Sequence, residues 1–208
     1  MAETRTLRDE WEVQPRLESL DLNKPRLLNV RTTAIGAAAD ATLYHPANAA
    51  GTFSYHQGVF ALRNEFVGDV WKVDRTNGVE TIRNDTKRVK IVFSNVDIAC
   101  DDEHQPKPRS SKGSGTERLC LGNDLFSGLP HYFSLPQSGQ NDWAIYYLMV
   151  ASDGAVELSL PIVKGGTFKN FIERLYLSDG SDLDTVSKLS LDDKDIADDF
   201  DPKVARKK

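Results

Sequence analysis

The spacing of apolar residues follows a helical period in one part of the chain. After position 51, apolar side chains recur at i, i+4, i+7 and i+11, which is one face of an α-helix: Tyr55, Val59, Leu62 and Phe66. Thr52 or Ser54 is suited to cap the start of this helix, and Gly68 to end it. The preceding residues 31–46 (RTTAIGAAADATLYHP) have only a weak pattern, and we predict a strand followed by a loop there.

Further along, the pattern changes to the period of β-strands. Within residues 69–83 (DVWKVDRTNGVETIR), the pair Asn77-Gly78 favours a type I′ turn between two strands, because both central residues of that turn need a positive φ. Residues 89–99 (VKIVFSNVDIA) are rich in β-branched side chains, which predicts a core strand. Residues 143–150 (WAIYYLMV) are apolar on both faces, which predicts a central strand.

The last patterned segment follows a turn at residues 152–154. Residues 155–163 (AVELSLPIV) alternate between apolar and polar positions, and we predict that they pair antiparallel with residues 143–150. Pro161 has no N–H to donate, so this strand is expected to end there or to lie on an edge of the sheet. After Gly165-Gly166, Thr167 is predicted to cap a helix with a buried apolar stripe: Phe168, Phe171, Ile172 and Leu175.

These elements predict an α+β fold in which antiparallel β-hairpins form a sheet, with about two packed helices and a long polar loop. We expect a single domain at residues 31–178 and an acidic, flexible tail at residues 179–208. Residues 1–30 are expected to form a loosely attached arm with one short helix, because Pro15 and Pro25 break any long helix. No apolar run is long enough to span a bilayer and the N-terminus has no apolar core, so a cytoplasmic protein without membrane contact is expected.

The net charge of −5 is unevenly distributed along the 208 residues. Residues 1–178 carry 20 basic and 22 acidic side chains, whereas residues 179–201 carry nine Asp and two Lys. The acidity therefore belongs to the tail, and the body has no overall basic excess of the kind that accompanies duplex binding. Such a tail solubilises the chain, docks on a basic partner, or competes with nucleic acid for a basic groove.

The most suggestive stretch is residues 100–120 (CDDEHQPKPRSSKGSGTERLC), predicted to be a long loop because Pro, Ser and Gly interrupt regular structure. Its start is acidic, and its body carries four cations spaced by small residues: Lys107, Arg109, Lys112 and Arg118. Flexible cations neutralise a phosphate backbone without demanding one geometry. We therefore expect a non-catalytic cytosolic binding protein whose residues 104–118 contact nucleic acid, single-stranded for example, or a protein partner. The alternative is a solvated, disordered loop.

Two metal-binding interpretations compete with this expectation. A Cys2His2 set is present but lacks the close Cys pair of a zinc finger: Cys100, His104, Cys120 and His131. Carboxylates near a strand end, with a lysine nearby, suit a metal-dependent phosphodiesterase or nuclease: Asp97, Asp101 and Glu103, with Lys87 or Lys90. Neither signal is specific, so no metal and no cofactor are expected. A third alternative is a structural subunit of a larger complex.

Two further groups of residues carry possible chemistry. The pairs Tyr44-His45 and Tyr55-His56 lie eleven residues apart. We expect His45 and His56 not to share a site, because helical spacing places His56 beside Phe60 and Arg63. Aromatic residues of the predicted strands either stack bases or form core, and core is expected because residues 143–150 are apolar on both sides: Phe93, Tyr132, Phe133, Trp143, Tyr146 and Tyr147.

Overall fold

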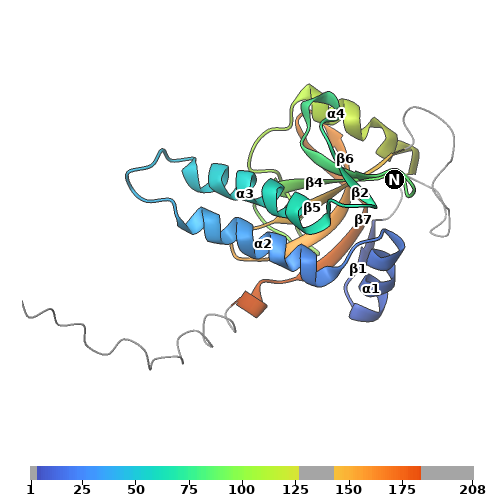
Figure 1. Ribbon diagram of the computed structural model, residues 1–208, viewed down its shortest axis with the longest axis horizontal. Coiled ribbons are helices and arrows are strands. Elements are labelled where there is room, and N and C mark those ends of the chain that lie inside the picture. The colour runs from blue at the N-terminus through green and yellow to red at the C-terminus, as the bar shows by residue number, and fades with distance from the viewer. Residues whose placement is uncertain (1–3, 127–142, 184–208) are drawn as a thin grey trace, which may run out of the picture.

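The computed structural model describes residues 4–126 and 143–183, which form an α+β fold around one seven-stranded sheet (Figure 1). In the order β1-β7-β6-β5-β4-β3-β2, the strands are β1 (Arg5–Leu7), β7 (Thr167–Ser178), β6 (Val156–Lys164), β5 (Ala144–Val150), β4 (Val89–Asn95), β3 (Thr81–Asn84) and β2 (Trp71–Asp74). The α-helices are α1 (Glu10–Ser19), α2 (Lys24–Ala39), α3 (Ala49–Phe66) and α4 (Ser114–Cys120), and 3-10 turns occupy η1 (Thr76–Gly78) and η2 (Leu121–Phe126).

The sheet is mixed and not purely antiparallel, and more than the two expected helices pack on it. β4 pairs parallel with β5, and β1 pairs parallel with β7, whereas the other neighbours are antiparallel. A parallel pair needs a long crossover, which the residues between β4 and β5 supply. Hairpin signals reveal only neighbours joined by short turns, so neither parallel pairing is visible in the sequence pattern.

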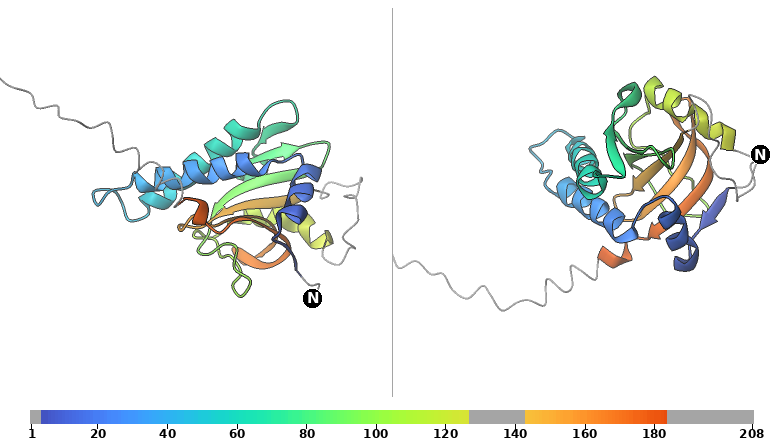
Figure 2. Two further views of the ribbon diagram at one scale, coloured as in Figure 1. Left: turned by 90° about the horizontal axis from the view of Figure 1, so that it is seen from below. Right: turned by 45° about the vertical axis from the view of Figure 1, so that its right-hand side comes forward.

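Alternation along the strands divides the core between the two faces of the sheet. In β5, Tyr146 and Leu148 face one apolar cluster, and Tyr147 and Met149 face the other. The first cluster is covered by α1, α2 and α3, and the second by the segment after β4 together with α4. Figure 2 shows the curved sheet with α2 and α3 on one side and α4 on the other. β5 is buried along its whole length, which confirms the predicted central strand.

Two predicted hairpins and one predicted helix are confirmed. β5 pairs antiparallel with β6 across the turn at residues 151–155. β2 pairs antiparallel with β3, and Asn77 and Gly78 between them have φ values of 58° and 73°. α3 contains the predicted apolar stripe, although it begins at Ala49 and thus earlier than the Thr52 or Ser54 cap implies.

Residues 31–46 do not contain the predicted strand, because α2 runs through their first part. Asn23 caps α2 by accepting a hydrogen bond from the backbone N–H of Arg26, and Pro25 lies in the first turn, where its missing N–H costs nothing. Leu27, Val30 and Ala34 then form the buried side of the helix. The helical period is difficult to recognise in the sequence because the apolar stripe of α2 ends in alanines. A run of such small residues resembles a loop.

The chain after Gly165 and Gly166 forms the long strand β7 and not the predicted helix. The two glycines have φ values of 62° and 73°, so they close a tight hairpin between β6 and β7. Register shifts on both sides of Pro161 accommodate the missing N–H, so β6 neither ends at Pro161 nor lies at an edge, but continues to Lys164 as an interior strand. Because of the same register shifts, the apolar side chains of β7 change from one face of the sheet to the other. Their spacing in the sequence therefore resembles that of a helix.

Residues 5–30 are packed against the body and are not a loose arm. Leu7 of β1 and Val13 and Leu17 of α1 are buried in the first apolar cluster. Pro15 lies inside α1 without preventing the helix. At the other end, residues 179–183 are described, and the remainder of the predicted tail lies outside the described residues. No described helix is both long and apolar enough to cross a membrane.

Asn123 fills a gap between two strands. Its side chain accepts a hydrogen bond from the N–H of Ile145 (2.9 Å) and donates to the carbonyl oxygens of Ile145 (3.1 Å) and Pro161 (2.8 Å). Asn123 is fully buried and lies beyond the last paired residues of β5 and β6, Tyr147 and Ser159. The amide therefore replaces ladder hydrogen bonds where the strands diverge at the bulge.

Replacing Asn123 with Ala is expected to lower the free energy of unfolding by about 2–3 kcal/mol, because buried backbone groups lose their partners. Chemical denaturation monitored by fluorescence measures this change. Asn29→Ala serves as a control on the surface of α2. A loss below about 1 kcal/mol would contradict the bridging role.

Candidate nucleic-acid interface

The segment after β4 is a structured strap and not a disordered loop. Val96 forms an antiparallel bridge with Pro108, and the N–H of Asp97 donates to the carbonyl of Lys107 (3.0 Å). Further along, the N–H of Lys112 donates to the carbonyl of Gly166 in the β6–β7 turn (2.8 Å). The strap therefore runs from the end of β4 to the β6–β7 turn. The predicted loop is correct only as far as Gly113, because α4 begins at Ser114.

Three of the four predicted site residues lie on the surface of this region. Lys107 and Arg109 are exposed on the strap, and Arg118 is exposed on α4. Arg109 donates to the carbonyl of Val96 (3.2 Å) and to Oγ of Ser152 (2.9 Å), so its guanidinium is held in place by neutral groups.

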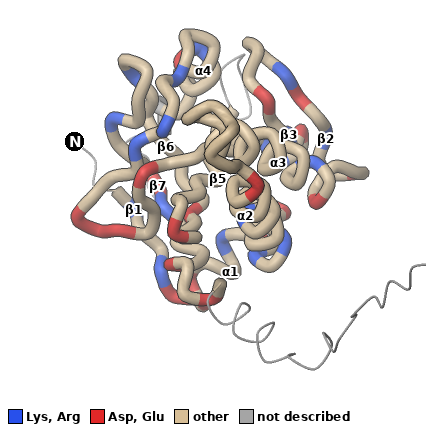
Figure 3. The backbone as a smooth tube through the Cα atoms, turned by 90° about the vertical axis from the view of Figure 1, so that its left-hand side faces the viewer, with Lys and Arg blue, Asp and Glu red and all other residues tan. Residues whose placement is uncertain are grey.

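A further exposed cation, Lys169, lies in β7 next to Asn170, although no sequence signal marks it. Gln105 of the strap contacts the neighbouring Asn170 (3.5 Å). The carboxylate of Glu117 accepts a hydrogen bond from the N–H of Gly166 (2.8 Å), which joins α4 to the β6–β7 turn. Figure 3 shows blue segments gathered beside α4, β6 and β7.

Lys112, the fourth predicted residue, points inward. Its Nζ donates to Oγ of Ser94 (2.8 Å) and lies 5.6 Å from the ring centres of Tyr147 and Phe168. Burial lowers the pKa of the Lys112 amine to about 8. Lys112 therefore anchors the strap to the sheet, and the structure separates it from the exposed cations.

The exposed cations differ from the other basic residues in their partners. Within the described residues, no carboxylate forms an ion pair with Lys107, Arg109, Arg118 or Lys169. Most other cations do have such a partner: Arg5, Arg8, Arg16, Lys24, Arg26, Arg31, Arg63, Lys72, Arg75, Arg83, Lys87, Lys90 and Arg174. We call Lys107, Arg109, Arg118 and Lys169 the cation surface.

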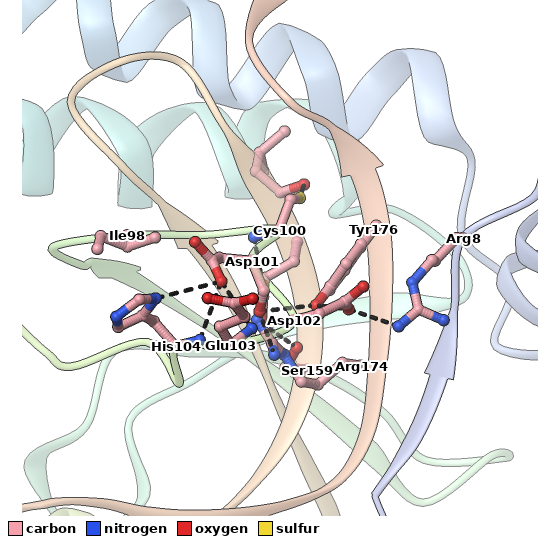
Figure 4. A network of polar contacts seen from close by, with 12 residues as sticks. Arg8, Ile98, Cys100, Asp101, Asp102, Glu103, His104, Ser159, Arg174 and Tyr176 are labelled. Atoms are coloured by element: carbon pink, nitrogen blue, oxygen red, sulfur yellow. Dashed lines mark hydrogen bonds and ion pairs between the residues drawn. The ribbon is translucent and has the colours of Figure 1, made fainter.

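A buried polar network fixes the beginning of the strap (Figure 4). Glu157 is fully buried on β6, and Arg174 of β7 donates to both of its oxygens (3.0 and 2.7 Å). The N–H of Cys100 donates to the same carboxylate (2.7 Å). Arg174 and Tyr176 also donate to the carbonyl of Asp101 (2.8 and 2.9 Å). These contacts hold Cys100 at φ 56°, a conformation that non-glycine residues rarely adopt.

The strap carboxylates Asp97 and Asp101 accept hydrogen bonds from backbone N–H groups of the strap. Asp97 accepts hydrogen bonds from the N–H groups of Ile98 (2.8 Å) and Lys107 (2.7 Å). Asp101 accepts from the N–H groups of Glu103 (2.7 Å) and His104 (2.9 Å). Among residues 4–126 and 143–183, no group of three or more His, Cys, Asp or Glu side chains is placed to hold a metal ion.

The cysteine and histidine candidates occupy separate surroundings. Cys100 and Cys120 are free, and burial raises the pKa of each thiol to about 12, so neither is a ready thiolate ligand. His131 of the proposed zinc set lies outside the described residues. The Nδ1 of His45 accepts a hydrogen bond from the N–H of Thr42 (3.0 Å), whereas His56 lies on α3 beside Tyr55.

The aromatic residues of the strands form core and do not provide a stacking platform. Phe93, Tyr146 and Tyr147 are fully buried, as expected, and Trp143 is half-buried beneath Lys90, whose Nζ lies 5.0 Å from the indole. The positions 132 and 133 lie outside the described residues. Within the described part, the cation surface therefore supplies charge without aromatic side chains for base stacking.

Lys90 and Asp74 form a second buried ion pair, at 2.7 Å, between β4 and β2. Burial acts to raise the pKa of Asp74, but hydrogen bonds from Lys90 and Thr76 outweigh it and lower the pKa to about 2. The pKa in the folded state is thus below the unfolded value of about 3.9. The pair contributes stability above that unfolded value, and this contribution is lost as pH falls from about 4 to about 2.

The Asp74→Asn variant is expected to be less stable than the wild type at pH 7 and to lose less additional stability on acidification from about pH 4 to about pH 2. Urea denaturation at a series of pH values measures both effects. Asp85→Asn, on the exposed end of the same hairpin, serves as the control. Parallel stability–pH curves for wild type and Asp74→Asn would contradict this assignment.

Comparison of the chain with protein-family models, with curated proteins and with solved structures found no match.

Proposed function

We propose that this protein binds nucleic acid through the cation surface and acts without catalysis. The observation that carries the proposal is that four exposed cations on the strap, α4 and β7 have no carboxylate partner in the described part of the chain: Lys107, Arg109, Arg118 and Lys169. A cation already paired with a carboxylate gives little to an added anion, whereas these four side chains remain available to phosphate oxygens.

The proposed contact is with the phosphate backbone. The described aromatic residues of the sheet are occupied in the core, so base stacking does not contribute there. Binding is therefore expected to be tolerant of sequence and governed by salt, because each phosphate contact releases counterions. The rigid strap lowers the ordering cost of binding, since its backbone is already fixed by hydrogen bonds to β4 and to the β6–β7 turn.

Fluorescence anisotropy with labelled single- and double-stranded oligonucleotides across a salt series tests this proposal. Four phosphate contacts give a slope of roughly −3 to −4 in a plot of log affinity against log salt. A fourfold rise in salt should then weaken binding by roughly 100-fold. Absence of binding to both oligonucleotides at low salt, even when the acidic tail is neutralised, would overturn the proposal.

A structural-subunit function is the second candidate, and the α2–α3 hairpin favours it. Figure 1 shows this hairpin projecting beyond the sheet. At its tip Leu43 and Tyr44 are fully exposed, and residues 41–62 contain no Lys, Arg, Asp or Glu. The His45 contact with Thr42 closes the tip and holds both side chains outward. Exposed apolar residues on a surface depleted of charge are typical of protein interfaces.

Size-exclusion chromatography with light scattering tests this candidate for self-assembly. We expect the wild type to be oligomeric and the Leu43→Ser/Tyr44→Ser variant to be monomeric. Trp11→Ser removes an exposed apolar side chain from α1 and should leave the assembly unchanged. A monomeric wild type at all concentrations would contradict assembly through this tip.

A further inference from the structure

The last described residues are fixed close to one end of the cation surface. The guanidinium of Arg31, which is buried in α2, donates to both oxygens of Asp182 (2.7 and 2.6 Å) and to the carbonyl of Gly154 (3.4 Å). The side chain of Leu183 packs directly over Gly154, where an added Cβ would lie 2.4 Å from its Cδ1. The chain therefore leaves the body at the β5–β6 turn.

The same turn holds a member of the cation surface. Ser152 of the β5–β6 turn accepts a hydrogen bond from Nη2 of Arg109 (2.9 Å). The turn of residues 151–155 thus contacts both Arg109 and Leu183, the last described residue. Whatever follows Leu183 begins its path next to the strap.

The sequence that follows is the most acidic part of the chain. Residues 184–201 carry seven Asp and two Lys. Nine residues lead from Leu183 to Asp192, and an extended chain of that length spans up to about 30 Å. This reach, together with the tethering at Leu183, gives the carboxylates an effective concentration in the millimolar range at the strap.

From this juxtaposition we propose that residues 184–201 dock on the cation surface of their own chain and compete there with nucleic acid. The proposal rests on the function proposed above and specifies its regulation. The carboxylates take the positions of phosphates, and nucleic acid must displace them. The apparent affinity for nucleic acid then equals the intrinsic affinity multiplied by the fraction of chains in which the cation surface is free.

The test uses the full-length chain and two variants of its tail. One variant has Asp→Asn at positions 184, 192, 193, 195, 198, 199 and 201, and the other has Asp→Glu at the same positions. We expect the Asn variant to bind a labelled oligonucleotide at least about 10-fold more tightly than the wild type at low salt, and the Glu variant to match the wild type. The difference should shrink as salt rises, because salt screens the competing charges.

A second measurement separates this inference from the proposed function. A labelled synthetic peptide of residues 184–201 is titrated with the Asn variant, with no nucleic acid present. Binding of the peptide, and its loss when the cation surface is also replaced by Ala, supports docking even if no oligonucleotide binds. The inference is overturned if the oligonucleotide binds the wild type and the Asn variant equally and the peptide does not bind. The proposed function would then still stand.

Discussion

Replacing Arg174 with Ala is expected to lower the free energy of unfolding by about 3–5 kcal/mol, because it leaves the carboxylate of Glu157 buried without its cation. Glu157 has no exposed surface and depends on Arg174, Ser159 and the N–H of Cys100 for its hydrogen bonds. Arg174 also holds the carbonyl of Asp101. Loss of the guanidinium should therefore destabilise the sheet and release the beginning of the strap.

Equilibrium denaturation in urea measures this change, and a paired variant provides the control. Glu157→Leu with Arg174→Met removes both charges while retaining apolar volume, and it should cost clearly less than Arg174→Ala alone. Hydrogen exchange should show faster exchange at residues 100–104 in Arg174→Ala. A loss of less than about 1 kcal/mol would show that the pair does not fix the strap.

The second large effect concerns binding. Replacing all four residues of the cation surface by Ala is expected to flatten the log–log salt slope by roughly three units and to remove most of the affinity for oligonucleotides. The fold should persist, because the four side chains are exposed and make no ion pair in the described part of the chain. Circular dichroism and urea denaturation establish that the variant is folded.

The matched control removes the same number of charges from elsewhere on the surface. Lys24, Arg26, Lys72 and Arg75 each have a carboxylate partner, and their joint replacement by Ala changes the net charge equally. The control should retain the slope of the wild type within about one unit. Equal loss of binding in both variants would show that net charge matters and that position does not.

The sequence pattern is sufficient to predict elements whose signals are local. Asn77 and Gly78 supply the positive φ values of a hairpin, and the alternation around Leu158 predicts the pairing of β5 with β6. The failures arise where tertiary structure overrides the pattern. Bulges around Pro161 change which face of the sheet the side chains of β6 and β7 occupy. The apolar residues within 168–175 are therefore spaced in the sequence like the stripe of a helix.

The candidate site was predictable only in part, for a similar reason. The spacing of small residues identifies Lys107, Arg109 and Arg118 as exposed cations, and the structure places them on the surface. The pattern does not distinguish Lys112, which turns inward because Ser94 of a distant strand accepts its hydrogen bond. Lys169 is missed because it lies in a segment whose spacing resembles a helix, and only the folded β6–β7 hairpin places its neighbour Asn170 against Gln105 of the strap.

The central claim is that nucleic acid binds at the cation surface, and lysine labelling tests it most directly. The chain is acetylated briefly with and without a saturating single-stranded oligonucleotide, and mass spectrometry quantifies modification at each lysine. We predict that the oligonucleotide protects Lys107 and Lys169 and leaves Lys72 and Lys87, on and beside the β2–β3 hairpin, unchanged. Protection of Lys72 and Lys87 with no change at Lys107 and Lys169 would contradict the account.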